Sequence, residues 1–275
     1  MELYQLIINQ VANALDEDVG SGDISAELID ASARLDTELL VREDAVLCGG
    51  PWFDEVFRQC DETISVEWLA KDGDSIGAGQ VVARISGPAR PLLTAERSAL
   101  NFLQTLSGTA TTTRAYADII QGTNCRILDT RKTIPQLRHA QKYAVVCGGG
   151  CNHRKGLYDA YLVKENHLAA CGGIARAAAR ARQLHADKLL EIEVETLEQL
   201  QQAIDANVDR VLLDNFTLEM MREAVSLNAG RVELEASGNV DSDSLRAIAE
   251  TGVDFVSSGA LTKHLRAIDF SLRYC

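Results

Sequence analysis

The feature of the sequence that most restricts its fold is a regular alternation of short apolar runs with amphipathic segments after residue 120. Six apolar runs suited to strands occur at residues 125–128, 160–163, 189–194, 210–213, 232–234 and 254–257. Segments with helical spacing of apolar residues lie between most of them, at 174–184, 197–206, 218–226 and 242–250. Because strands that alternate with helices are joined by crossover connections, this alternation predicts a parallel sheet in an α/β domain.

Polar residues at the ends of these runs favour a barrel over an open sheet. They stand at the predicted carboxyl ends of five strands: Lys164, Glu193, Asp214, Glu235 and the pair Ser257 and Ser258. From Glu193 onward the steps between them are 21, 21 and 22 residues. In a barrel the carboxyl ends of the strands converge on one mouth, whereas an open sheet spreads them along an edge. A doubly wound sheet stays open as the alternative, because six strands are visible and closure is inferred.

The sequence before residue 120 has a different character. Apolar spacing predicts a helix within the first twenty residues and a long helix over 93–120. Between them, short β-rich runs at 38–41, 65–69 and 80–85 are separated by Gly and Asp turns. A compositional boundary falls at the Pro-containing stretch 87–91. The residues before it are therefore expected to form a small α+β domain.

Bulk composition narrows the class of protein. No apolar run approaches the ~20 residues that span a bilayer, and the first twenty residues carry acids instead of the basic start of a signal peptide. A cytoplasmic protein is expected. The seven cysteines are odd in number and scattered, which predicts reduced thiols and not a disulfide framework.

The charge is strongly negative overall but is distributed unevenly. A net charge of −13 argues against nucleic acid or an anionic membrane as a partner. Residues 126–164 hold eight Lys and Arg against two acids, a local charge of +6, so the other residues sum to −19. This segment predicts an anion site, and a solvated basic face is the alternative.

Two clusters in that segment can bind anions. Thr130, Arg131 and Lys132 follow a predicted strand, where an Arg fork and a Lys point charge can hold two anionic groups. Three glycines at 148–150 precede His153 and Arg154, a combination that suits carboxylate or phosphate. A solvated turn and a flexible loop are the respective alternatives. Zinc binding by Cys147, Cys151, His153 and His167 is a further alternative, without the paired short spacings of structural zinc sites.

Two further groups lie at the predicted mouth of the barrel. Glu193, Asp214 and Glu235 can bind Mg²⁺, accept hydrogen bonds from sugar hydroxyls, stabilise a developing cation or balance the basic cluster. The small-residue loops 236–239 and 257–260 follow the last two strands, where barrels often bind phosphate.

Distinct motifs follow one another along nearly the whole chain: Glu17-Asp-Val-Gly-Ser-Gly-Asp23, Glu96-Arg97 with Asn101, Asp129-Thr-Arg-Lys-Thr133, Lys142-Tyr-Ala-Val145, the glycines 148–150, Asn152-His-Arg154, Lys164-Glu-Asn-His167, Leu213-Asp-Asn-Phe216, Glu235-Ala-Ser-Gly-Asn239 and Gly259-Ala-Leu-Thr262. Together they resemble the quinolinate phosphoribosyltransferase family, also called carboxylating nicotinate-nucleotide pyrophosphorylase. The resemblance implies an N-terminal α/β sandwich domain (1–105, against which the last residues of the chain can also pack). It implies a barrel of fewer than eight strands over 106–275.

The resemblance also implies an activity and an assembly. The reaction would join quinolinate to phosphoribosyl pyrophosphate, giving nicotinate mononucleotide, pyrophosphate and CO₂ on the route to NAD. The protein would be a homodimer or higher oligomer in which Arg97 reaches the partner's site.

The roles that the resemblance assigns fall into three groups. The carboxylates of quinolinate would be held by Arg97, Arg131, His153, Arg154 and Lys164. The donor's phosphates would be bound by Lys132, with Thr130 beside it, and by the loop residues Ser237, Gly238, Asn239, Ser258, Gly259 and Ala260. Glu193 and Asp214 would bind Mg²⁺ or ribose hydroxyls, and Lys132, Lys164, Glu193 and Asp214 would form the catalytic set.

Departures from the family pattern are few. Gln136 stands where Gly is expected in a Pro-Gly-Leu-Arg turn, and Cys151 stands at a variable position. A related group associated with molybdenum transport, nicotinate phosphoribosyltransferase and a non-catalytic anion-binding protein are the alternatives. The Asn-His-Arg and Lys-Glu-Asn-His motifs argue against the first, and the retained acids argue against the last.

Overall fold

The computed structural model describes residues 3–238 and 240–275 of the chain, which forms two compact units. Unit 1 extends to Arg114 and adds Ile134–Gly149 and His264–Cys275. Unit 2 comprises Ala115–Thr133 and Gly150–Lys263. The chain therefore passes between the units four times, because the segment 134–149 and the C-terminal residues both return to unit 1.

Unit 1 is built on a four-stranded antiparallel sheet of order β12-β1-β5-β3. The strands are β1 (Arg34–Val41), β3 (Ser65–Trp68), β5 (Val81–Pro88) and β12 (Phe270–Tyr274), and a small two-stranded sheet pairs β2 (Ala45–Val46) with β4 (Ser75–Ile76). Thr37 and Leu39 of β1 and Ala83, Ile85 and Gly87 of β5 are buried at alternate positions, so one face of the sheet packs into the core there. The short helix η1 (Ala26–Leu28) precedes β1.

Four helices complete unit 1: α1 (Leu3–Val19), α2 (Gly50–Cys60), α3 (Ala89–Ile119) and α4 (Arg138–Cys147). The apolar face of α2 buries Trp52, Phe53 and Phe57 in the core, which gives this short amphipathic helix most of its stability. The helix α3 runs for 31 residues and contributes a row of small and apolar side chains to the same core.

The domain boundary expected from the sequence differs from this division. The sequence placed residues 1–105 in the first domain, whereas unit 1 continues along α3 to Arg114. It also assigned 134–149 to the barrel. In the structure Ala140 and Ala144 of α4 belong to the core of unit 1, with Leu137, Tyr143 and Cys147 packed against it. The physical reason is that α4 buries its apolar side in that core.

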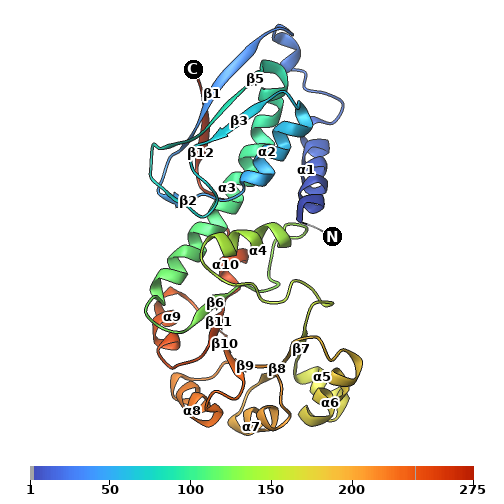
Figure 1. Ribbon diagram of the computed structural model, residues 1–275, viewed down its shortest axis with the longest axis vertical. Coiled ribbons are helices and arrows are strands. Elements are labelled where there is room, and N and C mark those ends of the chain that lie inside the picture. Colours follow the sequence, from blue (N-terminus) through green and yellow to red (C-terminus); the bar gives the residue numbers. More distant parts are fainter. Residues whose placement is uncertain (1–2, 239) are drawn as a thin grey trace. The chain divides into compact units, whose positions relative to one another are not determined.

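Unit 2 contains six parallel strands of order β6-β11-β10-β9-β8-β7. They are β6 (Arg126–Leu128), β7 (Tyr161–Val163), β8 (Leu190–Val194), β9 (Arg210–Asp214), β10 (Glu233–Ser237) and β11 (Phe255–Ser257). They follow an arc in Figure 1. On the far side of β6, Cys151 forms a single parallel bridge with Leu128. The predicted α/β class, with fewer than eight strands, is confirmed.

Helices on the outer side of this arc connect the strands (Figure 1). They are α5 (Glu165–Cys171), α6 (Ile174–Leu184), α7 (Leu197–Asp205), α8 (Leu218–Asn228) and α9 (Ser242–Ala249), and the short α10 (Ala260–Lys263) follows β11. Local caps set where three of them begin, because the side chains of Thr196, Thr217 and Asp241 accept hydrogen bonds from the backbone N–H groups three residues on. No helix among the described residues is both long and apolar enough to cross a membrane.

Candidate active site

The carboxyl ends of the strands in unit 2 carry the polar residues that the sequence placed there, with one exception. Asp214, Ser237 and Ser257 end β9, β10 and β11, Glu193 is the penultimate residue of β8, and Lys164 caps α5 directly after β7. Glu235 was expected at a strand end but lies in the middle of β10 and is fully buried. The strand extends to Ser237 because β10 continues its ladder with β9 as far as Asp214.

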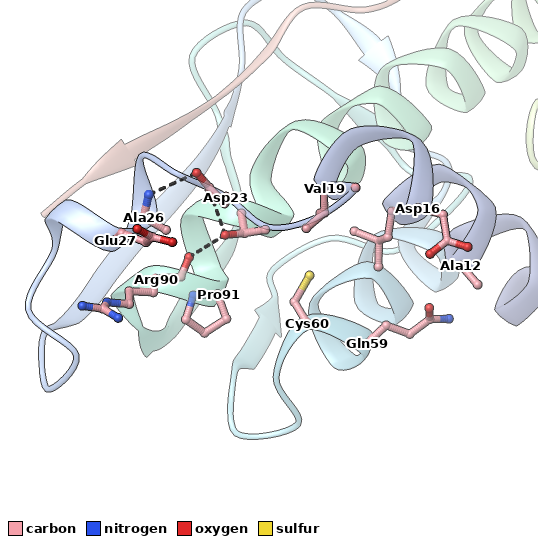
Figure 2. A pocket seen from close by; sticks show the side chains of 13 residues that line it. Ala12, Asp16, Val19, Asp23, Ala26, Glu27, Gln59, Cys60, Arg90 and Pro91 are labelled. Carbon is pink, nitrogen blue, oxygen red and sulfur yellow. Dashed lines mark hydrogen bonds between the residues drawn. The ribbon is translucent and has the colours of Figure 1, made fainter.

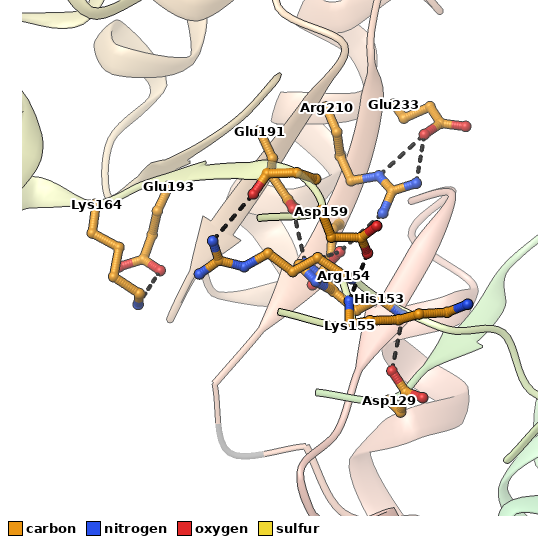
Figure 3. A network of polar contacts seen from close by, with 12 residues as sticks. Asp129, His153, Arg154, Lys155, Asp159, Lys164, Glu191, Glu193, Arg210 and Glu233 are labelled. Carbon is orange, nitrogen blue, oxygen red and sulfur yellow. Dashed lines mark hydrogen bonds and ion pairs between the residues drawn. The ribbon is translucent and has the colours of Figure 1, made fainter. Parts of the chain in front are cut away.

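An ion pair joins two of the predicted catalytic residues. The ammonium of Lys164 lies 2.6 Å from a carboxylate oxygen of Glu193 (Figure 3). The Lys164 side chain is half exposed, whereas Glu193 is largely buried. The cation therefore has its countercharge in place and still faces solvent.

Asp129 connects the two anion-binding clusters. It is fully buried after β6, and its carboxylate accepts hydrogen bonds from Asn152 Nδ2 at 2.7 Å and from the backbone N–H of His153 at 2.9 Å. These bonds hold the 152–154 segment beside the turn that carries Arg131 and Lys132. In the sequence Asp129 stands out only as the first residue of the Asp129-Thr-Arg-Lys-Thr133 motif, whereas the structure makes it a buried anchor.

Arg131 and Arg154 lie close enough for their charges to repel. Burial lowers the pKa of Arg154, and the charge of Arg131 lowers it further. The Arg154 guanidinium also donates to the carbonyl of Ala160 at 3.3 Å. Two guanidiniums whose charges repel each other favour the binding of an anion nearby.

The loop after β11 meets the turn that carries Lys132. Thr262 Oγ1 donates to the Lys132 carbonyl at 2.8 Å, and the backbone N–H of Ser258 donates to the Leu128 carbonyl at 3.0 Å. A Cβ atom at Gly259 would lie 2.8 Å from Lys132 Cδ, so the glycine allows this close approach. Thr130 Oγ1 accepts a bond from the Lys132 backbone N–H and stabilises the turn. Ala260 opens α10 in the same loop.

A buried acid–base cluster, formed by His153, Glu191 and Glu235, lies on the inner face of the strands. His153 Nε2 lies 2.8 Å from Glu191 and 3.6 Å from Glu235, while Nδ1 accepts a bond from the Arg154 N–H (Figure 3). Burial raises the pKa of both carboxyl groups, and the charge of Glu191 raises that of Glu235 further. At neutral pH the two therefore share at least part of a proton.

Arg210 lies beside this cluster and contacts three other side chains. Its guanidinium is 2.7 Å from Glu233 and 3.6 Å from Glu235, and it stacks over the Phe255 ring with 4.1 Å to the centroid. Arg126 stacks on the same ring at 4.3 Å. Paired charges and stacking of this kind stabilise cations inside a protein.

Two pockets differ in size and in chemistry. The larger, of about 610 Å³, lies in unit 1 between α1, η1, α2 and α3 (Figure 2). In this pocket the Asp23 carboxylate already accepts hydrogen bonds from Ser25 N, Ala26 N and Thr94 Oγ1. Asp23, the last residue of the Glu17–Asp23 motif, therefore has a structural role. The smaller, of about 270 Å³, lies in unit 2 against His153, Arg154, Lys155, Glu191 and Arg210. Its charged lining makes the second pocket the better candidate for anion chemistry.

The structure does not gather every residue that the sequence proposed. Arg97 is exposed on α3 of unit 1, and Asn239 lies outside the described residues. Asp214 accepts a bond from Asn215, and Gly238 follows the end of β10 at a φ of +101°. The +6 segment is not one patch, because Arg138 and the buried Lys142 belong to α4 of unit 1.

The zinc alternative has no support in the geometry. Among the described residues, the clusters with metal-ligand spacing are Cys48, Asp72 and Cys147 in unit 1, and His153, Glu191 and Glu235 in unit 2. Neither combines Cys147, Cys151, His153 and His167. His167 instead accepts a hydrogen bond from the Lys164 backbone through Nδ1.

The residues that sequence reasoning missed are the buried ones, Glu191 and Arg210 above all. One signal was present. In the run Leu190-Glu-Ile-Glu-Val194 two acids alternate with apolar residues, which places both carboxylates on one face of a strand. That face is the inner one, where Glu191 meets His153.

Parallel strands with a basic cluster, paired acids at their carboxyl ends and glycine loops after the last strands are typical of an α/β enzyme that acts on small anionic substrates. The chain matches the family models "Quinolinate phosphoribosyl transferase, N-terminal domain" over residues 23–107 and "Quinolinate phosphoribosyl transferase, C-terminal domain" over residues 109–273. The chain belongs to the quinolinate phosphoribosyltransferase family.

Individual relatives agree with this assignment. The probable carboxylating nicotinate-nucleotide pyrophosphorylase of Bacillus subtilis is 40% identical over 257 residues, which cover 93% of this chain and 89% of the relative. The solved nicotinate-nucleotide pyrophosphorylase of Francisella tularensis is 47% identical, with a TM-score of 0.97 over 100% of this chain and 98% of that one. NadC from Streptococcus pyogenes is 41% identical, with a TM-score of 0.95 over 100% and 99%.

Proposed function

We propose that this enzyme transfers phosphoribosyl from phosphoribosyl pyrophosphate to quinolinate with decarboxylation, giving nicotinate mononucleotide, pyrophosphate and CO₂ for the synthesis of NAD. Relatives at 40% and 47% identity that carry the name of this reaction support the assignment. The observation that carries it in this chain is the pair Arg131 and Arg154, whose charges repel each other in a half-buried place, because two such cations suit an acceptor with two carboxylates.

Acceptor binding would draw on the basic residues of unit 2. Arg131 and Arg154 would hold the carboxylates of quinolinate by paired hydrogen bonds, and Lys164 would add a third cation. His153 lies beside them, but its Nε2 faces Glu191 and its Nδ1 accepts the Arg154 N–H. We therefore propose that His153 contributes to acceptor binding by holding Arg154 in place.

Donor binding would use the Lys132 turn and the loops after β10 and β11. Lys132 and Thr130 lie against the Ser258, Gly259 and Ala260 loop, so a phosphate bound there would meet both a cation and backbone N–H groups. Ser237, Gly238 and Asn239 would supply the second phosphate loop.

The acids at the strand ends fit a magnesium ion. Glu193 and Asp214 lie on neighbouring parallel strands, two residues apart in register, so their carboxylates belong to the same face and supply the hard oxygen ligands that Mg²⁺ prefers. When bound, Mg²⁺ would offset the charge of the pyrophosphate. Asp214 and Glu193 would themselves stabilise the positive charge that develops on the ribose as pyrophosphate leaves.

The chemistry follows from charge. The quinolinate ring nitrogen bonds to the anomeric carbon as the bond to pyrophosphate breaks, and the nitrogen becomes positively charged. That charge favours loss of the adjacent carboxylate as CO₂, and a proton replaces it on the ring carbon. We propose Lys164 as the proton donor, since its ammonium is half exposed at the mouth of the strands. Preorganised groups of this kind contribute roughly 2.7–4 kcal/mol each in other enzymes.

Assembly and location complete the proposal. We propose a homodimer, or a higher oligomer of dimers, in which Arg97 serves the site of the partner subunit. The exposed position of Arg97 on α3 supports this role. All seven cysteines are free, which fits a cytoplasmic enzyme.

The test is incubation of the purified chain with quinolinate, phosphoribosyl pyrophosphate and Mg²⁺, with nicotinate mononucleotide and CO₂ measured together. Equal amounts of both products are expected. Absence of product at saturating substrate would overturn the proposal, and product from nicotinate without CO₂ would reassign the acceptor. Arg131→Ala and Arg154→Ala should each raise the KM for quinolinate at least tenfold, while Arg180→Ala, at an exposed position of α6, serves as the matched control.

A further inference from the structure

We propose that Cys48 and Cys147 form a reversible thiol-oxidation site, in which a hydroperoxide converts the two thiols to a disulfide and small-molecule thiols restore them. Both residues belong to unit 1. Their sulfur atoms and an Asp72 oxygen lie within 4.8 Å of one another. Cys48 is fully buried after β2, and Cys147 is the half-buried last residue of α4. The two sulfurs are thus neighbours although 99 positions separate them in the sequence.

The carboxylate of Asp72 holds the two segments together. Its two oxygens accept the backbone N–H groups of Gly49 and Gly50, next to Cys48, each at 3.1 Å. The oxygen that binds Gly49 also accepts the hydroxyl of Tyr143, one helical turn before Cys147, at 2.8 Å. Tyr143 also packs its ring on Trp52 at 5.4 Å. The contact between the thiols is therefore built into the fold.

The helix α3 fixes the backbone at both cysteines. Ser107 Oγ accepts the N–H of Cys48 at 3.0 Å and donates to its carbonyl at 3.1 Å. Arg114 donates to the carbonyls of Cys147 and Gly148 at 3.5 and 3.1 Å. A disulfide needs the sulfurs to close to about 2.05 Å with the Cβ atoms about 3.5–4.5 Å apart. We expect rotation of the two side chains to bring the sulfurs together from a separation of at most 4.8 Å.

The two thiols differ in reactivity, as an attacking and a resolving thiol must. A hydrogen bond from Cys48 lowers the pKa of Cys147, although burial opposes this. Burial raises the pKa of Cys48 well above its usual range. The half-buried Cys147 is therefore the better nucleophile, and Cys48 keeps its proton.

The oxidation balances in two steps. The Cys147 thiolate attacks one oxygen of the hydroperoxide, which gives a sulfenic acid and releases hydroxide or alkoxide. The Cys48 thiol then attacks that sulfur, the S–S bond forms and water leaves. The two sulfurs together lose two electrons, which reduce the peroxide bond.

A metal ion is the weaker occupant of this cluster. Asp72 already accepts two backbone N–H groups and one hydroxyl, so three of its acceptor positions are used. Cys48 is also fully buried, and burial favours its protonated form, whereas a metal ligand must be the thiolate.

The experiment treats the reduced full-length chain with increasing hydrogen peroxide, stops the reaction in acid and counts free thiols under denaturing conditions. The count should fall from seven to five. Peptide mapping without reductant should find residues 48 and 147 in one linked peptide that dithiothreitol separates. The proposal is overturned if Cys48 and Cys147 still react with iodoacetamide after other cysteines have been oxidised.

Two single-cysteine variants show whether the link depends on the pair of thiols and not on a loss of folded protein. In Cys48→Ser the resolving thiol is missing, so a sulfenic acid at Cys147 should accumulate and be trapped by a cyclic 1,3-diketone. Cys60→Ser is the matched control, since Cys60 is half-buried on α2 of the same unit and should leave the 48–147 link unchanged. Should Cys147 of the intact chain go on to sulfinic acid while Cys48 stays free, the two thiols do not act as a pair.

Discussion

Lys164 carries its own counterion before any substrate arrives, since Glu193 lies 2.6 Å from its ammonium. A carboxylate of quinolinate must compete with that partner. In Glu193→Gln the competing charge is gone, so quinolinate alone should bind about two- to fivefold more tightly, the range of a half-exposed ion pair worth roughly 0.5–1 kcal/mol. Turnover should fall at least tenfold, because the carboxylate no longer faces the developing cation.

Isothermal titration with quinolinate and steady-state kinetics check the two halves of this prediction separately. Glu195→Gln is the control, because Glu195 is exposed just beyond β8. Weaker binding of quinolinate to Glu193→Gln would mean that Glu193 orients Lys164 and does not compete for it.

Glu235 makes the stability of unit 2 depend on pH. Burial, and secondly the charge of Glu191, raise its pKa to about 8 in the folded chain, against an ordinary value of 4.5. The folded state therefore binds the proton more tightly, so this stabilisation is complete below the ordinary value and is lost as the pH rises toward 8. In Glu235→Gln the side chain stays neutral, and that part of the pH dependence should disappear.

The contribution of Glu235 to the pH dependence of stability is measured by thermal unfolding between about pH 5 and pH 9. The wild-type midpoint should fall by several degrees more than that of the variant. Glu233 lies on β10, like Glu235, and pairs with Arg210 of β9. Glu233→Gln should keep the wild-type dependence of the unfolding midpoint on pH. Parallel slopes for wild type and Glu235→Gln would show that the buried pair does not titrate in this range.

Gln136, one of the departures from the family pattern, has a backbone conformation that favours glycine. Its φ of +66° is a left-handed conformation that glycine adopts without strain, and the sequence has Gln where Gly was expected. Gln136→Gly should therefore stabilise unit 1 by about 0.5–1 kcal/mol, seen as a higher denaturation midpoint. Ala229→Gly, at a φ of +48° in unit 2, should act in the same direction. A lower midpoint for Gln136→Gly would mean that contacts of the Gln side chain outweigh the strain.

At the scale of elements, the loop after β10 depends on a close approach of two turns. Gly238 has a φ of +101°, and a Cβ atom there would lie 2.2 Å from Asn215 Oδ1. Asn215 in turn donates its backbone N–H to the Ser237 carbonyl and its side-chain amide to Asp214. Gly238→Ala must therefore displace the Asn215 side chain, whose amide donates to Asp214, and kcat/KM for phosphoribosyl pyrophosphate should fall at least tenfold, the effect of about 1.4 kcal/mol.

The matched control separates strain from displacement. Gly230 has a φ of +75°, but a Cβ atom there would meet nothing within 4 Å. Gly230→Ala should lower the unfolding midpoint of unit 2 and leave kcat/KM within about twofold. Equal kinetic losses in both variants would contradict the role of the Gly238 approach.

Elements with local causes could be predicted from the sequence. The helices α6 and α7 were predicted at 174–184 and 197–206 and observed at Ile174–Leu184 and Leu197–Asp205, because apolar spacing and, for α7, the Thr196 cap lie within them. The strand β12 was not predicted, because its partner β1 is more than 200 residues away and the pairing has no local sign. The extent of β10 was missed for a similar reason, since its ladder with β9 carries it past Glu235.

The residues of the candidate site also divide into those whose position could be predicted from the sequence and those whose position could not. Lys164, Glu193 and Asp214 could be predicted because strand ends and charge are both visible in the sequence. Glu191 could not, because the sequence does not say which strand acids meet a histidine from a distant loop. The anchoring of His153 by Asp129 depends on the same long-range packing.

At the scale of the whole molecule, the two units are not consecutive pieces of chain. Unit 1 takes in three segments and unit 2 takes in two. The residues after Lys263 return to unit 1, where β12 adds the edge strand beside β1. A boundary drawn at one position of the sequence therefore could not describe the division, whichever position was chosen.

Arg97 provides the test of the proposed assembly, because it belongs to unit 1 whereas Lys164 belongs to unit 2. If Arg97 serves the partner's site, Arg97→Ala and Lys164→Ala should each be nearly inactive as homodimers. In a mixture, each hybrid dimer carries both lesions in one site and neither in the other. Random exchange makes half the dimers hybrids, so activity should return to about a quarter of wild type.

Native mass spectrometry of differently tagged subunits establishes that exchange has occurred, and the activity of the mixture is then compared with that of each variant alone. The double variant Arg97→Ala, Lys164→Ala mixed with wild type is the matched control, because with a shared site its hybrids carry one substitution in each site and should add no activity to that of the remaining wild-type dimers. Mixtures that stay inactive after complete exchange would place Arg97 and Lys164 in the same subunit's site. Recovery is possible only where the two residues come from different chains, so it distinguishes a shared site from two independent ones.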